Sequence, residues 1–209
     1  KSYALGITLT FELLDKKLDK VTKVYIHSQM QQNETFARIT SICNEHNIPI
    51  EFNDKVFRIL SDKENVFVIG EFIKYKTFLD NNDNHIMLVN PSNAGNLGTI
   101  IRTMVGFGVK NLAIITPAVD IFDPKVIRAS MGAIFNINYA LYDDYNDYLL
   151  ENKKHHLYPF MLQTNNNISN VVKHSLYTLV FGNEATGLPH NYLNIGTPIK
   201  IVHSQDIDS

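Results

Sequence analysis

Apolar and polar residues alternate in some stretches of the chain, and in others apolar residues recur at helical spacing. In the first part, alternation over Val21 to Ser28 predicts a strand, and the apolar spacing over Asn33 to Asn47 predicts a helix. A short strand over Ile48 to Phe52, a helix over Asp54 to Leu60 opened by an Asp cap, and a strand over Val66 to Tyr75 follow. These elements together predict a small α/β unit.

The second part continues the alternation of strands and helices. His85 to Asn90 predicts a buried strand, Thr99 to Phe107 a helix that Gly108 ends, and Asn111 to Thr116 a strand parallel to the first. This alternation favours a parallel sheet with helices on both faces. The remaining predicted elements are helices over Pro124 to Gly132 and Tyr145 to Asn152, and strands over Ile137 to Ala140, Leu157 to Gln163, Leu176 to Phe181 and Pro198 to His203.

A polar stretch separates the two parts. Residues 80–84 are all Asp or Asn, which favour turns because their side chains bind the nearby backbone. The sequence therefore predicts a first domain over residues 1–79, a linker over 80–84 and a second domain over 85–209.

Composition narrows the class of protein. Apolar residues make up 44% of the 209 residues and charged residues 19%, which are values typical of a soluble globular protein. Nineteen basic and 21 acidic residues give a net charge of −2, so any nucleic-acid binding must use a local basic site. No apolar run is long enough to span a membrane and no signal peptide is evident, so we expect a cytoplasmic protein. A single cysteine, Cys43, excludes a disulfide framework and is expected in the core.

Three polar stretches follow predicted strands, at the sheet edge where α/β proteins bind ligands. In the first, Asn96 and Gly98 precede the predicted helix, and Arg102 falls in its first turn. The positive end of the helix dipole disfavours a cation there, so Arg102 points to an external anion such as phosphate. An ordinary solvated arginine is the alternative.

The second stretch runs from Leu179 to Leu188, and the third from Ile199 to Ser209. In the second, Gly182 and Gly187 allow close backbone approach to a ligand, and Glu184 is a lone carboxylate between them. A simple turn from strand to helix is the alternative for this stretch. The third stretch is a strand that ends in a polar loop.

The order and spacing of these stretches resemble the SpoU family of the SPOUT superfamily, which are RNA ribose 2′-O-methyltransferases. Asn96, Gly98 and Arg102 match the family's first motif, N-x-G-x-x-x-R. Phe181, Gly182, Glu184, Gly187 and Leu188 match the second, F-G-x-E-x-x-G-L. Of the S-L-N core of the third motif, only Ser209 is present. The likeness covers residues 85–209.

The resemblance implies a parallel sheet with a deep trefoil knot, preceded by a ribosomal-protein-L30e-like RNA-binding domain over residues 1–79. It implies a homodimer that takes S-adenosyl-L-methionine as cofactor and tRNA or rRNA as substrate. Gly182, Ile201 and Leu188 match cofactor-binding positions. Arg102, Asn96, Glu184 and Ser209 match catalytic positions.

The chemistry of methyl transfer to a ribose hydroxyl assigns a role to Arg102. A neutral hydroxyl is a weak nucleophile, and a fixed guanidinium can stabilise the developing alkoxide, although an arginine that stays protonated is a poor base. An RNA-binding or cofactor-binding pseudoenzyme of the same fold remains an alternative. A dinucleotide-dependent enzyme is disfavoured because the glycine fingerprint is missing.

Other polar residues are weaker candidates. Arg128 is a second candidate for an RNA phosphate. The spacing of His155, His156 and His174 does not suggest a metal site, and none is expected. The lysines between Lys16 and Lys23 are expected to form a solvated charged face.

Overall fold

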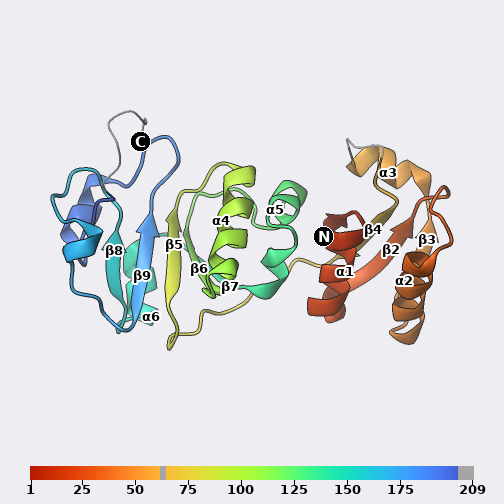
Figure 1. The fold of residues 1–209 in the computed structure, drawn as a ribbon, viewed down its shortest axis with the longest axis horizontal. Coiled ribbons are helices and arrows are strands. Elements are labelled where there is room, and N and C mark those ends of the chain that lie inside the picture. The colour runs from red at the N-terminus through yellow and green to blue at the C-terminus, as the bar shows by residue number, and fades with distance from the viewer. Residues whose placement is uncertain (62–64, 202–209) are drawn as a thin grey trace. The chain divides into compact units, whose positions relative to one another are not determined.

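The structure is a computed structural model that describes residues 1–61 and 65–201 (Figure 1). The chain divides into two compact units, each built from three segments of sequence. One unit contains Lys1–Lys76, Ala94–Gly106 and Asp120–Ile137. The other contains Thr77–Asn93, Phe107–Val119 and Asn138–Ser209, of which residues up to 201 are described.

The sheet of the first unit has four strands in the order β1-β4-β2-β3. β4 is antiparallel to both of its neighbours, whereas β2 and β3 run parallel. The strand bounds are β1 Ser2–Leu5, β2 Val21–Ile26, β3 Ile50–Phe52 and β4 Val68–Phe72.

Apolar clusters lie on both faces of this sheet. On one face, helices α1 (Ile7–Lys16) and α2 (Glu34–Glu45) pack against the strands. Cys43 is fully buried there, as predicted, and burial raises the pKa of its thiol to about 11. On the other face, Phe57 of α3 (Asp54–Leu60) packs against two residues of the sheet. The cluster under α1 and α2 contains Leu14, Val24, Ile26, Ile39, Cys43, Ile48 and Val68.

The first strand and the first helix, β1 and α1, were not predicted from the sequence. Helix α1 nevertheless has an apolar face, since Leu9, Leu13 and Leu14 recur at helical spacing and are all buried. Strand β1 pairs only with β4, which follows it by more than 60 residues, so its pairing has no local signal.

Helix α3 has the predicted bounds, but the predicted Asp cap is wrong. Asp54 is the first helical residue, and the capping position belongs to Asn53, whose side chain makes no capping hydrogen bond. The Asp54 carboxylate instead accepts hydrogen bonds from the backbone N–H of Ser28 at 2.8 Å and from its hydroxyl at 2.7 Å. The carboxylate therefore fixes the loop after β2.

Helices α4 (Ala94–Gly106) and α5 (Pro124–Ala129) complete the first unit, together with a short 3-10 helix, η2 (Ala133–Asn136). The predicted start of α4 at Thr99 is wrong, because the helix begins five residues earlier. Gly98 explains the difference. A Cβ on Gly98 would lie 2.5 Å from the Cβ of Ala129 and 2.6 Å from the carbonyl oxygen of Val126. Gly98 is therefore a helical contact point for α5 and not part of a loop.

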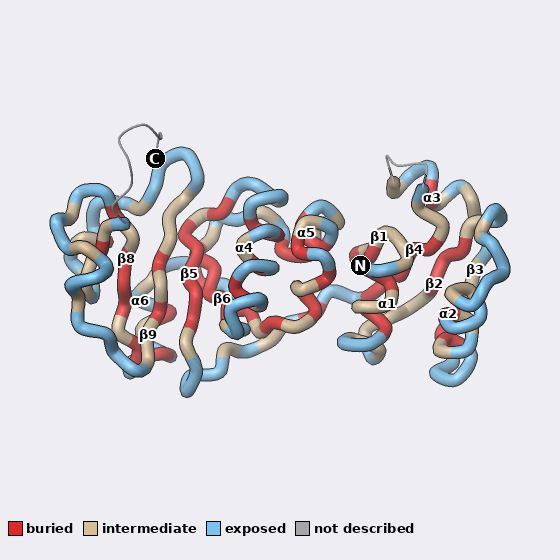
Figure 2. Tube along the Cα trace, in the orientation of Figure 1, coloured by how far each residue is buried: buried red, intermediate tan, exposed pale blue. Residues whose placement is uncertain are grey.

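The second unit contains a five-stranded sheet in the order β7-β6-β5-β9-β8. All neighbouring strands are parallel, so the predicted parallel sheet is confirmed. The central strand β5 is buried along its whole length (Figure 2). The strand bounds are β5 His85–Val89, β6 Asn111–Ile115, β7 Asn138–Tyr142, β8 His156–Pro159 and β9 Tyr177–Phe181.

One apolar cluster covers a face of this parallel sheet. Helix α6 (Tyr145–Glu151) contributes the fully buried Tyr148, and the 3-10 helix η4 (His190–Asn194) contributes Tyr192. The strand predicted over Pro198 to His203 is replaced, in its described part, by isolated bridges at Ile199 and Lys200. The other buried members of the cluster are Met87, Val89, Ala113, Ile115, Tyr142, Leu157, Met161 and Val180.

Replacing Gly98 with alanine should destabilise the protein because the added methyl group would overlap the α5 backbone. We expect a loss of about 2 kcal/mol in the free energy of unfolding, measured by urea denaturation. Gly106 of the same helix is the matched control, since its Cβ would meet no atom within 4 Å. Gly106→Ala should be neutral or slightly stabilising. Equal effects of the two substitutions would contradict the packing argument.

Candidate functional site

The loops that follow β5, β8 and β9 meet at one edge of the parallel sheet. Because these strands run parallel, in the order β5, β9, β8, their carboxyl ends lie side by side (Figure 1). The loops are residues 90–93 after β5, 160–167 after β8 and 182–188 after β9. Ligands of parallel α/β sheets bind at this edge.

The loop after β9 folds back on itself through its glycines. The backbone N–H of Gly187 donates to the carbonyl oxygen of Asn183 at 2.9 Å, and the N–H of Asn183 donates to the carbonyl oxygen of Gly187 at 3.2 Å. A Cβ on Gly182 would lie 2.2 Å from the carbonyl carbon of Gly187 and 2.3 Å from the nitrogen of Leu188. Gly187 itself has a φ of 68°. Both glycines are thus required by the turn itself, and the close approach to a ligand that they were predicted to permit stays a prediction.

Glu184 joins this turn to the loop after β5. One carboxylate oxygen accepts hydrogen bonds from the Ser92 hydroxyl at 3.1 Å and the Ser92 N–H at 3.3 Å. The other oxygen accepts the N–H of Asn93 at 3.3 Å. Partial desolvation raises the pKa of Glu184, but hydrogen bonds from its own backbone N–H and from Ser92 and Asn93 outweigh it and hold the pKa below its ordinary value. The side chain is therefore an ionised carboxylate that binds backbone N–H groups.

A cavity of about 340 Å³ lies between the loops after β8 and β9. Leu188, a predicted cofactor-binding residue, lines it together with Glu184. Its volume falls within the range typical of small-molecule sites. The lining residues are Phe160, Met161, Leu162, Gln163, Asn183, Glu184, Ala185, Thr186, Gly187 and Leu188.

The segment before Ile201 is bound on two sides by one stretch of chain. On one side, the N–H of Ile199 donates to the carbonyl oxygen of Pro159 at 2.8 Å, and the N–H of Met161 donates to the carbonyl oxygen of Ile199 at 2.9 Å. On the other side, the N–H of Lys200 donates to Asn166 at 2.8 Å. Ile201, the other predicted cofactor residue, is 53% exposed at the end of this segment. Ser209 lies outside the described residues.

Asn96 and Arg102 both lie on α4, in the first unit, and both are exposed. The predicted position of Arg102 in the first helical turn is wrong. Because α4 begins at Ala94, Arg102 lies more than two turns into the helix, where its dipole has little effect. The structure thus gathers Gly182, Glu184 and Leu188 in one loop, and Asn96 and Arg102 on one helix.

Some of the surface lysines form ion pairs with carboxylates, whereas the two candidate arginines form none within the described ranges. Three of the four lysines predicted to form a solvated face have carboxylate partners: Lys16 pairs with Asp15, Lys20 with Asp19 and Lys23 with Glu51. Among the described residues, no ion pair involves Arg102 or Arg128, and both side chains are exposed.

The histidines take part in packing. His155 is buried, stacks on His85 with ring centroids 4.1 Å apart and contacts the carbonyl oxygen of Asp83 at 2.8 Å. His156 stacks on His174 at 3.8 Å. Residues 1–61 and 65–201 contain no group of three metal-ligating side chains. None of the helices in these ranges has the length and apolar character needed to cross a membrane.

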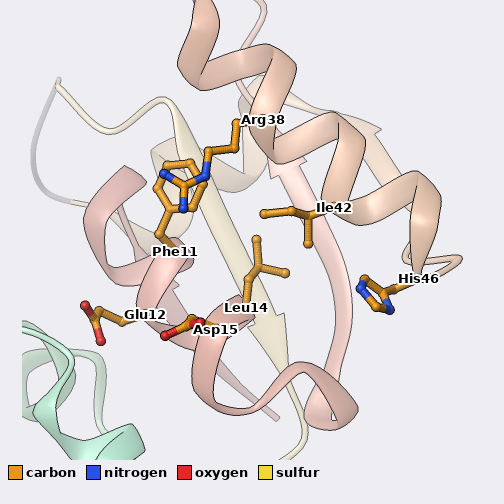
Figure 3. Close-up of a pocket in the computed structure, with 7 residues that line it drawn as sticks. All are labelled: Phe11, Glu12, Leu14, Asp15, Arg38, Ile42 and His46. Atoms are coloured by element: carbon orange, nitrogen blue, oxygen red, sulfur yellow. The ribbon is translucent and has the colours of Figure 1, made fainter.

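A second cavity, of about 390 Å³, lies between α1 and α2 (Figure 3). Leu14 and Ile42 point into it from the two helices, and the Arg38 guanidinium lies 4.8 Å from the centre of the Phe11 ring. The carboxylates of Glu12 and Asp15 line the same cavity and would repel a phosphate. None of the site residues predicted from the sequence lies there, so we place the candidate site at the sheet edge of the second unit.

These features define an α/β protein with a parallel sheet and a cavity at its carboxyl edge. Residues 83–209 match the model of the SpoU rRNA Methylase family. The match covers more than half of the 209 residues, and the chain belongs to this family.

Curated relatives match the chain over short segments. A 23S rRNA (uridine(2479)-2′-O)-methyltransferase from Streptomyces viridochromogenes is 35% identical over 52 residues, which are 25% of this chain and 18% of that protein. The mitochondrial rRNA methyltransferase 3 from Homo sapiens is 46% identical over 43 residues, which are 21% of this chain and 10% of that protein. The chain thus matches less than a fifth of the length of these relatives.

Solved structures match the chain over its full length. An AdoMet-bound rRNA methyltransferase from Sinorhizobium meliloti has a TM-score of 0.84 and 22% identity, covering 100% of this chain and 80% of that one. The SpoU methyltransferase AviRb from Streptomyces viridochromogenes has a TM-score of 0.83 and 14% identity, covering 100% and 82%. At these identities the likeness establishes the fold alone.

The lowered pKa of Glu184 predicts a pH-dependent contribution to stability. Because the folded pKa lies below the unfolded value of about 4.3, the contribution is complete above that value and is lost as pH falls through the folded pKa. Glu184→Gln should destabilise the protein at pH 7 by less than about 1 kcal/mol, since the side chain is exposed. Urea unfolding from pH 7 to pH 3 should show the difference between wild type and variant shrinking. A constant difference would contradict the ionised contact.

Proposed function

We propose that the chain transfers a methyl group from S-adenosyl-L-methionine to a ribose 2′-hydroxyl of tRNA or rRNA. The observation that carries the proposal is the glycine turn at 182–188, which borders a cavity at the carboxyl edge of the parallel sheet in a chain of the SpoU family. The names of the curated relatives and of the matched structures favour ribosomal RNA as the substrate to test first.

The second unit has the features that this cofactor needs. The cavity has room for a small molecule. Because Gly182 has no side chain, the backbone of Gly187 and Leu188 can pack directly against it. We assign cofactor binding to Gly182, Leu188 and Ile201. When bound, S-adenosyl-L-methionine supplies an electrophilic methyl group with a good leaving group.

The residues of the chain must then align and activate the hydroxyl. Arg102 holds the target nucleotide and stabilises negative charge as it develops on the 2′-oxygen, because a guanidinium stays protonated and donates several hydrogen bonds. The proton passes to a phosphate oxygen or to water. Asn96 orients Arg102 or the substrate backbone, Glu184 fixes the loop after β5 through Ser92 and Asn93, and Ser209 binds the substrate.

The finer features of the fold belong to the same proposal. The hydrogen bonds on both sides of Ile199 and Lys200 come from residues 159–166, at the end of β8 and just after it, which supports a chain threaded through that stretch as a trefoil knot. The L30e-like assignment of residues 1–79 and the homodimer rest on the resemblance of the sequence to its family, and the linker at 80–84 rests on its run of Asp and Asn.

The direct test incubates the protein with methyl-labelled S-adenosyl-L-methionine and bulk RNA. Transfer to a ribose blocks alkaline cleavage of the next phosphodiester bond, so the label should appear in alkali-resistant dinucleotides. Mapping the methylated nucleotides in total RNA would identify the substrate. Cofactor binding without transfer to any RNA would indicate the pseudoenzyme instead.

Arg102→Ala should reduce methyl transfer by at least about 100-fold, because one preorganised charge contact with a transition state contributes this much. Its cofactor affinity, measured by titration calorimetry, should stay within a few-fold of wild type. Gly182→Ala should show the opposite pattern and lose cofactor affinity, since its methyl group would overlap Gly187 and Leu188. An equal loss of cofactor affinity in Arg102→Ala would refute the role assigned to Arg102.

A further inference from the structure

The side chain of Asn183 uses both ends of its carboxamide, and each end contacts a different loop. Its oxygen accepts the N–H of Ala185 at 2.9 Å and the N–H of Thr186 at 3.2 Å, within the turn that lines the cavity. Its nitrogen donates to the carbonyl oxygen of Asn90 at 2.8 Å and to the Ser92 hydroxyl at 3.2 Å.

The contact with Asn90 fixes an unusual point in the backbone. Asn90 has a φ of 52°, a conformation that residues other than glycine rarely adopt. Its N–H donates to Ile115 of β6 at 2.9 Å, and its carbonyl oxygen is the one that Asn183 holds. The loop over residues 90–93 is therefore held in place from both the β6 side and the β9 side, and Asn93 is followed directly by the first residue of α4.

We propose that Asn183 is a positioning residue for methyl transfer, which fixes the loop ahead of α4 to the turn that lines the cofactor cavity. The inference rests on the proposed function for its catalytic consequence. Glu184 makes a parallel contact to Ser92 and Asn93, but a carboxylate can only accept hydrogen bonds. Asn183 adds the donor that the carbonyl oxygen of Asn90 requires.

Asn183→Asp tests the two ends of the side chain separately, because it keeps the acceptor oxygen and removes the donor N–H₂ group. The aspartate still accepts the N–H groups of Ala185 and Thr186, so the turn and the cofactor cavity should persist. It cannot donate to Asn90 while ionised, and it places a second negative charge beside Glu184. We therefore expect kcat to fall by about tenfold or more at saturating cofactor, with the cofactor Kd within about threefold of wild type. Asn183→Ala should impair both quantities.

A pH profile distinguishes positioning from a general loss of structure. Once protonated, the carboxyl group introduced by Asn183→Asp would regain a donor for Asn90, and the neighbouring Glu184 and the carbonyl oxygen favour its protonation. The ratio of kcat of the variant to kcat of wild type should therefore rise as pH falls from 8 to 5.5. Asn33→Asp is the matched control, since the Asn33 oxygen caps α2 by accepting the N–H of Phe36 and aspartate can do the same. Its ratio should stay near one.

Hydrogen exchange provides a readout that does not depend on activity. Asn183→Asp should speed amide exchange in peptides covering residues 89–94 and leave peptides covering 184–188 close to wild type. Unchanged exchange in the first region, or a loss of cofactor affinity that matches the loss of kcat, would overturn the inference. A wild-type protein that neither binds the cofactor nor methylates RNA would instead overturn the proposed function, while the exchange experiment would still test the link between the loops.

Discussion

The parallel pairing of β9 with β5 is the contact on which the candidate site depends. The two strands are about 90 residues apart in sequence, yet their register sets Phe181 of β9 beside Leu88 of β5. The two following loops therefore start from neighbouring points. Asn183 and Glu184 can reach Asn90, Ser92 and Asn93 only because the strands end together.

Most of the contacts that shape this edge involve the backbone, which explains why the turn after β9 contains two glycines. Gly182 has no side chain because the backbone of Gly187 and Leu188 occupies the space where a Cβ would lie. Gly196 is similarly constrained, since its Cβ would lie 2.0 Å from the carbonyl oxygen of Leu157. Substitutions here would displace main chain rather than a rotatable side chain, so the loops have little freedom to adjust.

Features with a local signal could be predicted from the sequence, and features that depend on packing could not. The strands of the parallel sheet were correct in kind because fully buried strands are short apolar runs bounded by turns. The start of α4 was wrong because Gly98 resembles a loop residue until α5 is packed beside it. The motifs identified the turn at 182–188, but the role of Asn183 was missed because asparagine is common in turns. Its contacts with Asn90 and Ser92 exist only once the sheet has brought the loops together.

The charge distribution limits how this chain could bind a polyanion such as RNA. The net charge of −2 gives no general attraction, and several surface lysines are neutralised by carboxylates, as in the pairs Lys23 with Glu51 and Lys74 with Asp120. In the described part of the chain, Arg102 and Arg128 belong to no such pair. Because a carboxylate partner must be displaced before a paired lysine can bind phosphate, an unpaired cation binds phosphate at lower electrostatic cost, and a guanidinium group also binds it through two hydrogen bonds at once. We therefore expect the RNA binding of the proposed function to use local cations such as these two arginines rather than the overall field of the chain.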